Sequence, residues 1–227
     1  MTLTAHAASL ATRARMRLRP GGAGLPPYRE VFGPLVTGRS FADVGAMWSV
    51  HGRYSFEAEE EGAKEVTAVD AMAPTTEFEA ERERRGSHVR FVRGDVNDPD
   101  LAIEVGPHDV VWSSGVLYHV PSPALTLERL AAMAAETLVV QSRTVPGRGA
   151  RAVFFPGMSA AERAPYARLF PGAAGVDSPF DPGAGYANWF WGLTPGALIA
   201  LVGLLEGFEV RRSIVRPLDT LVVASRR

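Results

Sequence analysis

The sequence FADVGAMWSVHG, residues 41–52, decides the expected fold of this 227-residue chain. A short apolar run ends at Asp43, Gly45 follows, and a loop closes on a second glycine, Gly52. If the run is a strand and the residues after Gly52 form a helix, backbone amides of the turn and of the helix N-terminus face a ligand. The stretch therefore predicts a β-strand, a turn that binds a nucleotide-like ligand, and an α-helix.

Apolar runs and helical stretches alternate along the chain after this point. The valine-rich runs are short enough for buried parallel strands and span residues 41–45, 65–70, 89–94, 109–114 and 137–142. The helical stretches between them span residues 53–61, 75–85, 99–105 and 124–135. This alternation predicts βαβ units with right-handed crossovers, and hence an α/β fold with a doubly wound parallel sheet.

The regular pattern is flanked by two less regular segments. Residues 1–40 are expected to form an N-terminal helical segment, and residues 41–227 one domain around the sheet. The alternation stops after Val145, and residues 146–192 are rich in glycine, proline and aromatic residues. A segment of this length in a compact domain is typical of a lid or binding element. We therefore expect an acceptor-binding insertion there, with one helix near residues 159–169.

The C-terminal part of the chain returns to regular structure. Thr194 and Pro195 favour an N-cap followed by proline at the first helical position, and Gly207 favours the end of that helix. Residues 209–215 and 220–225 predict two final strands joined by a hairpin turn.

The composition restricts the classes of protein that fit this chain. With 46% hydrophobic residues it can bury a large core, and a net charge of −1 gives no overall positive field for nucleic acid or a membrane surface. The absence of cysteine excludes disulfides, a thiolate nucleophile and cysteine-bound zinc. No apolar run reaches the roughly 18 residues of a membrane span. We therefore expect a soluble, cytoplasmic protein.

Polar residues and glycines stand at the ends of four consecutive predicted strands. They are Asp43 with Gly45, then Asp70, then Gly94 with Asp95 and Val96, then Ser113 with Ser114. An open parallel sheet binds its ligand at the carboxyl ends of its strands, so these groups should converge. Asp70 is placed to accept ribose hydroxyls and Asp95 to accept from a purine amine. Each residue alone is more often a turn former or helix cap, but together they predict a bound nucleoside.

The turn after the first strand also distinguishes between cofactors. Nicotinamide-binding proteins use a close glycine triplet that lets the backbone approach a pyrophosphate, and the loop from Gly45 to Gly52 lacks this triplet. A dehydrogenase is therefore the weaker interpretation, and a cofactor without phosphate is favoured.

Four segments carry a resemblance to a known family. FADVG, EVTAVD, VRFVRGDV and HDVVWSSGVLYHVPSP resemble the S-adenosylmethionine-dependent methyltransferases with a Rossmann-like seven-stranded sheet, over about residues 41–227. The VLYHVPSP run and the YSFEAEEEGAKEVTAVD block are most similar to the subgroup near the tRNA-uridine carboxymethyl transferases and the small-molecule or sugar O-methyltransferases. The resemblance implies strand order 3-2-1-4-5-7-6 with the last strand antiparallel, and S-adenosyl-L-methionine as the cofactor.

The same resemblance implies a set of cofactor-binding residues. Gly45 and its neighbours would line the methionine part, Asp70 would hold the ribose, Met72 and Asp95 would meet the adenine, and Ser114 would lie beside the sulfonium. The complete set is Asp43, Gly45, Ala46, Met47, Gly52, Asp70, Ala71, Met72, Gly94, Asp95, Val96, Ser113 and Ser114.

The loop after the first strand departs from the family pattern. It is longer than usual, and three bulky residues, Met47, Trp48 and His51, stand where small ones are usual. This change could reshape the methionine pocket or place Trp48 and His51 against the acceptor. Alternatively, Trp48 packs beneath the N-terminal segment.

Histidine is the side chain best matched to a general base at neutral pH. His88 and His108 begin strands at the amino edge of the sheet, on the wrong side for the ligand. His119 follows the fourth strand and is the preferred catalytic base; His51 is the second candidate. The alternatives are that the His119 ring binds a backbone carbonyl, or that both histidines act as a relay or hold a divalent metal such as Mg²⁺ with a carboxylate.

Aromatic residues cluster in and near the predicted insertion, and aromatic faces stack on sugars and planar rings alike. The predicted substrate-binding residues are Trp48, Tyr118, Phe155, Asp181, Tyr186, Trp189 and Trp191. Ordinary core packing is the alternative for the aromatic members.

The predicted function is an S-adenosylmethionine-dependent O-methyltransferase that acts on a hydroxyl of a small polar metabolite, with a carbohydrate or glycosylated compound preferred. The partners are then a small-molecule substrate, without nucleic acid or membrane, and the enzyme is a monomer or homodimer. One alternative is an RNA-modifying methyltransferase, suggested by the row Arg13, Arg15, Arg17 and Arg19. The other is a non-catalytic cofactor-binding regulator, suggested by the altered loop.

Overall fold

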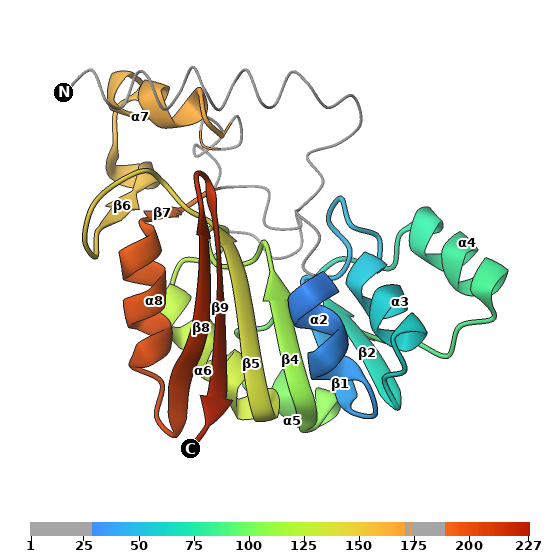
Figure 1. Ribbon diagram of the computed structural model, residues 1–227. Helices are drawn as coiled ribbons and strands as arrows, with labels where there is room; N and C mark the ends of the chain where they lie inside the picture. Colours follow the sequence, from blue (N-terminus) through green and yellow to red (C-terminus); the bar gives the residue numbers. More distant parts are fainter. Residues whose placement is uncertain (1–28, 171–172, 174–188) are drawn as a thin grey trace.

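The computed structural model describes residues 29–170, 173 and 189–227. Its centre is a seven-stranded sheet with the order β3-β2-β1-β4-β5-β9-β8 (Figure 1). The strands are β1 (Ser40–Val44), β2 (Glu65–Asp70), β3 (Arg90–Arg93), β4 (His108–Ser114), β5 (Ala134–Arg143), β8 (Phe208–Arg216) and β9 (Asp219–Arg226). The first five run parallel, whereas β9 is antiparallel to both β5 and β8. The predicted Rossmann-like α/β sheet, order 3-2-1-4-5-7-6 with an antiparallel last strand, is confirmed.

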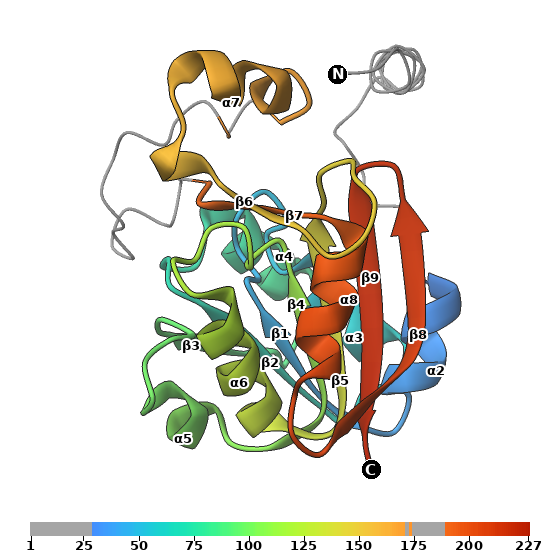
Figure 2. The ribbon, with the colours of Figure 1, turned by 90° about the vertical axis from the view of Figure 1, so that its left-hand side faces the viewer.

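Helices cover both faces of this sheet (Figures 1 and 2). One face carries α2 (Arg29–Val36), α3 (Arg53–Glu60) and α4 (Thr76–Arg85); the other carries α5 (Leu101–Val105), α6 (Pro123–Met133) and α8 (Pro195–Gly203). Successive side chains of a strand point to opposite faces. Accordingly, Phe41 packs in the core beneath α2–α4, and Ala42 packs in the core beneath α5, α6 and α8.

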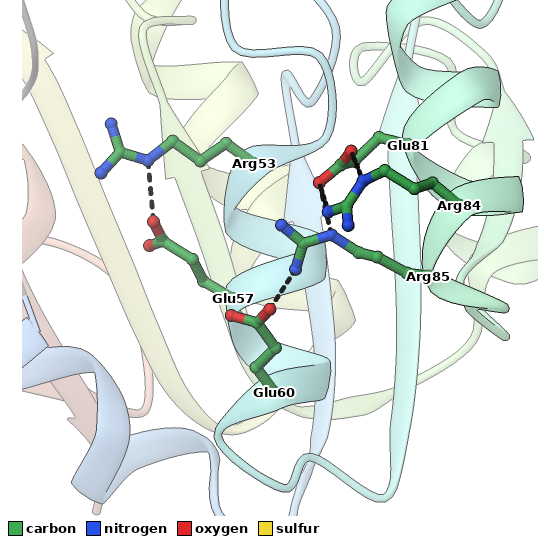
Figure 3. A network of polar contacts seen from close by, with 6 residues as sticks. All are labelled: Arg53, Glu57, Glu60, Glu81, Arg84 and Arg85. Carbon is green, nitrogen blue, oxygen red and sulfur yellow. Dashed lines mark hydrogen bonds and ion pairs between the residues drawn. The ribbon is translucent and has the colours of Figure 1, made fainter.

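Helices α3 and α4 are held together by an aromatic contact and by ion pairs. Phe56 of α3 stacks on Phe78 of α4 with ring centroids 5.3 Å apart, and both rings are buried. Beside them Arg85 pairs with Glu60 and Glu81, as Figure 3 shows. These contacts fix α4, and with it the turn that leaves the carboxyl end of β2.

A cap lies above the carboxyl edge of the sheet (Figures 1 and 2). It contains β6 (Ala152–Phe154), the 3₁₀ helix η1 (Phe155–Gly157), α7 (Ala160–Ala167) and β7 (Trp191–Leu193). Strands β6 and β7 form a separate antiparallel pair. The cap has its own core, formed by Val145, Phe155, Phe170, Ala173 and Leu218. A packed element therefore stands over the edge where parallel α/β sheets bind their ligands.

Some element ends differ from the sequence predictions. Helix α8 ends at Gly203 and not at Gly207, whose φ of 74° instead turns the chain directly into β8. Strand β5 begins at Ala134, so the last two residues of the predicted 124–135 helix belong to the sheet. Residues 1–28, including the arginine row at 13–19, lie outside the described part of the chain.

No helix in the described part of the chain has the length and apolar character to cross a membrane.

Candidate active site

The turn after β1 brings two strand ends into close approach. Gly45 has a φ of 89°, and its N–H donates to the carbonyl oxygen of Val69 at the end of β2. A Cβ added at Gly45 would lie 2.5 Å from Cγ2 of Val116 and 3.1 Å from the carbonyl oxygen of Ser114. Glycine is therefore required both by the backbone conformation and by the space between β1 and β4.

Asp70 joins two of the loops at this edge. Its Oδ2 accepts from the backbone N–H of Met47 and its Oδ1 from that of Met72, both at 2.8 Å. Burial raises the pKa of this carboxyl group, and the backbone donors oppose that shift. A carboxylate offers about four acceptor positions. Acceptor capacity remains beyond the bonds to Met47 and Met72, so Asp70 can hold the loops and still accept from a ligand hydroxyl group.

Asp43 is fully buried and only partly hydrogen-bonded. Its Oδ2 accepts from the Ser55 hydroxyl at 2.8 Å, whereas Oδ1 has no hydrogen-bond partner among the described residues. Burial raises the pKa of Asp43 to about 7, and the nearby charge of Asp70 adds to this effect. A buried oxygen without a partner is costly. Asp43 Oδ1 could therefore accept a hydrogen bond from a donor group of a bound ligand.

The ends of β3 and β4 supply the next groups along the edge. Asp95 is half-buried, and its Oδ1 accepts from the backbone N–H of Asn97 at 2.9 Å. The Asn97 side chain accepts in turn from Thr126 of α6 at 2.6 Å. Ser113 is buried, and its hydroxyl has no hydrogen-bond partner in the described ranges. Ser114 donates to Gln141 at 2.6 Å.

The other residues of the implied cofactor set form the backbone of this edge. Gly94 donates its N–H to the carbonyl oxygen of Asp70 at 2.9 Å. Gly52 has a φ of 74° and lies against the Phe78 ring, where a Cβ would come within 2.3 Å. Ala46 and Val96 are buried in the two cores, whereas Ala71 is half-exposed. The strand ends predicted to converge do so.

The long loop places its three bulky residues in different surroundings. The Met47 side chain is fully buried in the core beneath α2 and α3, so Met47 reaches the edge through its backbone. The Trp48 side chain is 52% exposed. His51 adopts a φ of 48°, and its Nδ1 lies 3.0 Å from the hydroxyl of Thr75 at the start of α4. His51 thus anchors the loop to α4. Packing of Trp48 on residues 1–28 lies outside the described part.

His119 lies beneath the cap among aromatic rings. The ring centroids of His119 and Tyr118 are 4.2 Å apart, and those of His119 and Trp189 are 5.8 Å apart. Trp189 also packs on Tyr118 and on Phe170 of the cap core. Burial raises the pKa of Tyr118 to about 12, so its phenol remains neutral at physiological pH. His119 and Tyr118 therefore meet the cap next to the end of β4.

The remaining predicted substrate-binding residues divide into three groups. Phe155 is fully buried in the cap core, so core packing accounts for it. Trp191 is half-buried and donates its indole N–H to the carbonyl oxygen of Pro121 at 3.0 Å, which ties the cap to the loop after β4. Asp181 and Tyr186 lie outside the described residues.

The structure adds polar residues that the sequence predictions lack. Ser55 pairs with Asp43, and Gln141 and Asp219 extend the hydrogen bonding from Ser114 across β5 and β9. Gln141 directly follows the apolar residues 138–140 of the predicted strand, and this position at the end of a strand could have identified it as a candidate site residue. Asp219 stands in a Pro-Leu-Asp hairpin turn, where an aspartate is ordinary.

No group of three or more acidic or histidine side chains in the described part of the chain is arranged to hold a metal ion. His51 and His119 contact different elements, α4 and the cap. The predicted divalent metal therefore has no support among these residues, and we do not propose one.

Comparison with known proteins identifies one matching family and several solved structures with a similar fold. Residues 43–136, from the end of β1 to the start of β5, match the family described as a methyltransferase domain. No curated protein matches the chain significantly. The chain is similar to magnesium protoporphyrin IX methyltransferase (ChlM) from Synechocystis PCC 6803 with bound SAH, with a TM-score of 0.59, 16% identity and coverage of 96% of this chain and 95% of that chain.

Two further solved structures are comparably similar. The N-terminal domain of EvdMO1, in the presence of SAH and D-fucose, has a TM-score of 0.57 and 16% identity, over 91% of this chain and 84% of that one. A protein described as a putative Zn-dependent alcohol dehydrogenase from Rhodobacter sphaeroides has a TM-score of 0.58 and 14% identity, over 92% and 91%. At sequence identities of 14–16%, the similarity to these three structures is a similarity of fold alone.

The matched domain and the Rossmann-like fold together support an S-adenosylmethionine-dependent methyltransferase as the class of this enzyme. A Rossmann-like sheet does not by itself select the cofactor, because one fold can carry unrelated functions. The methyltransferase match and the turn at Gly45, which lacks a pyrophosphate-binding glycine triplet, favour S-adenosylmethionine.

Proposed function

We propose that this protein is an S-adenosylmethionine-dependent O-methyltransferase of a small polar metabolite, with a carbohydrate or glycosylated compound as the preferred acceptor. It acts in the cytoplasm as a monomer or homodimer, without nucleic acid as a substrate. The observation that carries the proposal is the edge formed by the ends of β1, β2 and β4. There Gly45 opens the backbone, Asp70 keeps free acceptor positions, and Asp43 directs an unpaired buried oxygen.

The residues at this edge fit the parts of S-adenosylmethionine. Asp70 would accept the ribose hydroxyls with the acceptor positions not used by Met47 and Met72. Asp95 would accept from the adenine amine, with Met72 against the ring. The Gly45 turn would receive the methionine part, whose ammonium group is the kind of donor that the Asp43 oxygen lacks. When bound, the cofactor supplies an electrophilic methyl group on a positively charged sulfur.

The chain's own contribution to catalysis is alignment and proton removal. The cap and the aromatic rings around His119 enclose the acceptor and exclude water, which favours an in-line displacement. His119 lies just past the end of β4, where its imidazole is placed to take the proton of an acceptor hydroxyl. His51 is bound to Thr75 and is less well placed for this role.

The acceptor class follows from the groups that surround this position. Tyr118 and Trp189 provide flat apolar faces, whereas Arg143 and Asp219 provide charge close to the Tyr118 hydroxyl. Flat faces next to hydrogen-bonding groups suit sugars and other polyhydroxylated compounds. The structure of the EvdMO1 N-terminal domain in the presence of SAH and D-fucose is consistent with this preference.

Two experiments test the proposal. Calorimetry should show that S-adenosylhomocysteine binds and that Asp70→Ala weakens binding by about 1–3 kcal/mol, the range for losing a buried hydrogen-bonded carboxylate. Glu209→Gln is the matched control, because Glu209 is exposed and is the second residue of β8, at the opposite edge of the sheet. Equal affinities for wild type and Asp70→Ala would refute the cofactor site.

Transfer of a labelled methyl group, screened across sugars, phenols and tRNA, then identifies the acceptor; transfer to tRNA alone would refute the proposed acceptor class.

A further inference from the structure

Four polar side chains form a row along the carboxyl edge of the sheet. They are Asp43 of β1, Ser114 of β4, Gln141 of β5 and Asp219 of β9. Each stands two residues from an apolar residue of the core beneath α2–α4; these apolar residues are Phe41, Trp112, Val139 and Leu221. Because side chains two apart share a face of a strand, the row lies on the α2–α4 face. All four side chains are buried.

Three members of the row are joined in a fixed direction. Gln141 donates from Nε2 to the Asp219 carboxylate, and Ser114 donates from its hydroxyl to Oε1 of Gln141 at 2.6 Å. An ionised carboxylate only accepts, so it fixes which end of the Gln141 amide faces it. The amide oxygen must then face Ser114, and the Ser114 proton is committed to it. The Ser114 oxygen can therefore present only lone pairs to any other group.

The backbone of Ser114 belongs to the part of the edge nearest the Gly45 turn. The carbonyl oxygen of Ser114 borders the space that a Cβ at Gly45 would fill. The Tyr54 hydroxyl lies beside the Ser114 side chain, which acts on it as a hydrogen-bond partner, and the Asp43 carboxyl group is near enough to act on it by its charge. The Ser114 side chain thus has a second hydroxyl group, that of Tyr54, beside it. At the far end of the row Arg143 stands opposite Asp219 in the sheet register.

We infer that Asp219 and Gln141 are positioning residues, which orient the Ser114 hydroxyl so that its oxygen lone pairs face the positively charged sulfur of the cofactor. This inference rests on the proposed function. A site lined in this way binds the sulfonium form more tightly than the neutral thioether left after methyl transfer. The row therefore favours binding of the reactive cofactor and release of the spent one.

The test compares two ligands by calorimetry. One is S-adenosylhomocysteine, a neutral thioether; the other is an analogue with a protonated amine in place of the sulfonium. The measured quantity is the ratio of their dissociation constants. Ser114→Ala, Gln141→Leu and Asp219→Ala should each reduce the preference for the charged ligand by about tenfold, the scale of one hydrogen bond to a charged group.

Two control variants separate positioning from general damage to the fold. Asp219→Asn retains an oxygen that can accept from Gln141, so the preference should stay within about twofold of wild type on the same scale. Thr220→Val changes the next residue of β9, which is buried on the opposite face of the sheet and pairs with Thr144. It should leave the ratio unchanged.

A double variant shows whether Asp219 acts through Ser114. If it does, Asp219→Ala should have no further effect on the ratio of dissociation constants once Ser114 is alanine, because the hydroxyl group that Asp219 orients is already gone. An additive effect would overturn the inference, as would an unchanged ratio in Ser114→Ala. In both cases binding of the two ligands leaves the proposed function standing. Failure of wild type to bind either ligand would refute the proposed function itself.

Discussion

At Asp43, burial and hydrogen bonding act on one carboxyl group in opposite directions. Burial raises its pKa to about 7, and the hydrogen bond from Ser55 opposes this only in part. An aspartate in water, with a pKa of about 3.9, is ionised throughout the neutral range. Asp43 instead exchanges its proton near neutral pH, which makes its charge sensitive to pH and to a bound cation.

We expect Asp43 to make the protein less stable as the pH rises from about 4 to about 7. The folded-state pKa lies above the unfolded value, so the folded state retains a proton in this range that the unfolded state has released. The difference between 3.8 and about 7 corresponds to about 4 kcal/mol, an order-of-magnitude value for a fully buried group. The free energy of unfolding, measured across this range, should fall in wild type relative to Asp43→Asn. Parallel curves for the two proteins would show that Asp43 does not titrate there.

At His119 we expect a large effect on catalysis and a small one on cofactor binding. His119→Ala should lower the turnover by about 10²–10⁴-fold, the usual contribution of a general base, because no other imidazole lies beside Tyr118 in the described ranges. The affinity for S-adenosylhomocysteine should change little. His51→Ala is the matched histidine control, since that ring contacts Thr75 of α4. A larger loss of turnover in His51→Ala would reverse the two roles.

Among the elements, α3 and α4 show how packing outweighs charge. The Phe56 and Phe78 rings are buried and stacked, whereas Glu81 and Arg84 form their ion pair in solvent (Figure 3). Removing a buried phenylalanine leaves a cavity, but an exposed ion pair contributes little because water screens it. The position of α4 should therefore depend on its apolar face.

A pair of substitutions in α4 tests this difference. Phe78→Ala should lower the free energy of unfolding by about 3–5 kcal/mol, the range for truncating a buried phenylalanine. Glu81→Gln should leave it almost unchanged, although Arg84 and Arg85 hold the Glu81 pKa at about 2. Chemical denaturation measures both values. A comparable loss in Glu81→Gln would mean that the ion pairs of Figure 3 determine the helix contact.

The strands were predictable because a strand that is buried on both faces shows up in the sequence as a short run of mainly apolar residues. The run at residues 65–70 matches β2 at both ends, and every residue after Glu65 is buried, as expected for a parallel strand covered by helices. The ends of β5 and α8 were not. Ala134 favours a helix by its own preference but joins the sheet by pairing with His108, and α8 ends before Leu204, a residue that suits a helix interior equally well.

The candidate site was predictable to the extent that strand ends define it. Asp70 and Gly45 follow strands whose carboxyl ends must meet at one edge, so their proximity followed from the fold. Gln141 and Asp219 meet across β5 and β9, and that contact depends on the register of an antiparallel pair. Since a shift of one residue would turn either side chain to the opposite face, the sequence pattern alone could not identify the pair.

For the chain as a unit, the candidate site joins parts that are distant in sequence. The ligand edge draws on β1, β2, β3 and β4, and the cap covers it with segments from either end of the predicted insertion. Both cores of the sheet reach this edge. The loops at this edge form a binding site only in the folded chain. A ligand that binds there therefore stabilises the folded state.

Thermal unfolding should therefore report cofactor binding. At a concentration one hundred times its Kd, S-adenosylhomocysteine should stabilise the fold by about 2.7 kcal/mol. For a chain of this length that corresponds to a rise in Tm of about 5–10 °C. Asp70→Ala at the same ligand concentration should show a smaller rise, because a higher Kd reduces the stabilisation, whereas the exposed control Glu209→Gln should match wild type. If the Tm of wild type did not respond, or if Asp70→Ala responded as wild type does, the ligand would bind elsewhere than at the edge held by Asp70.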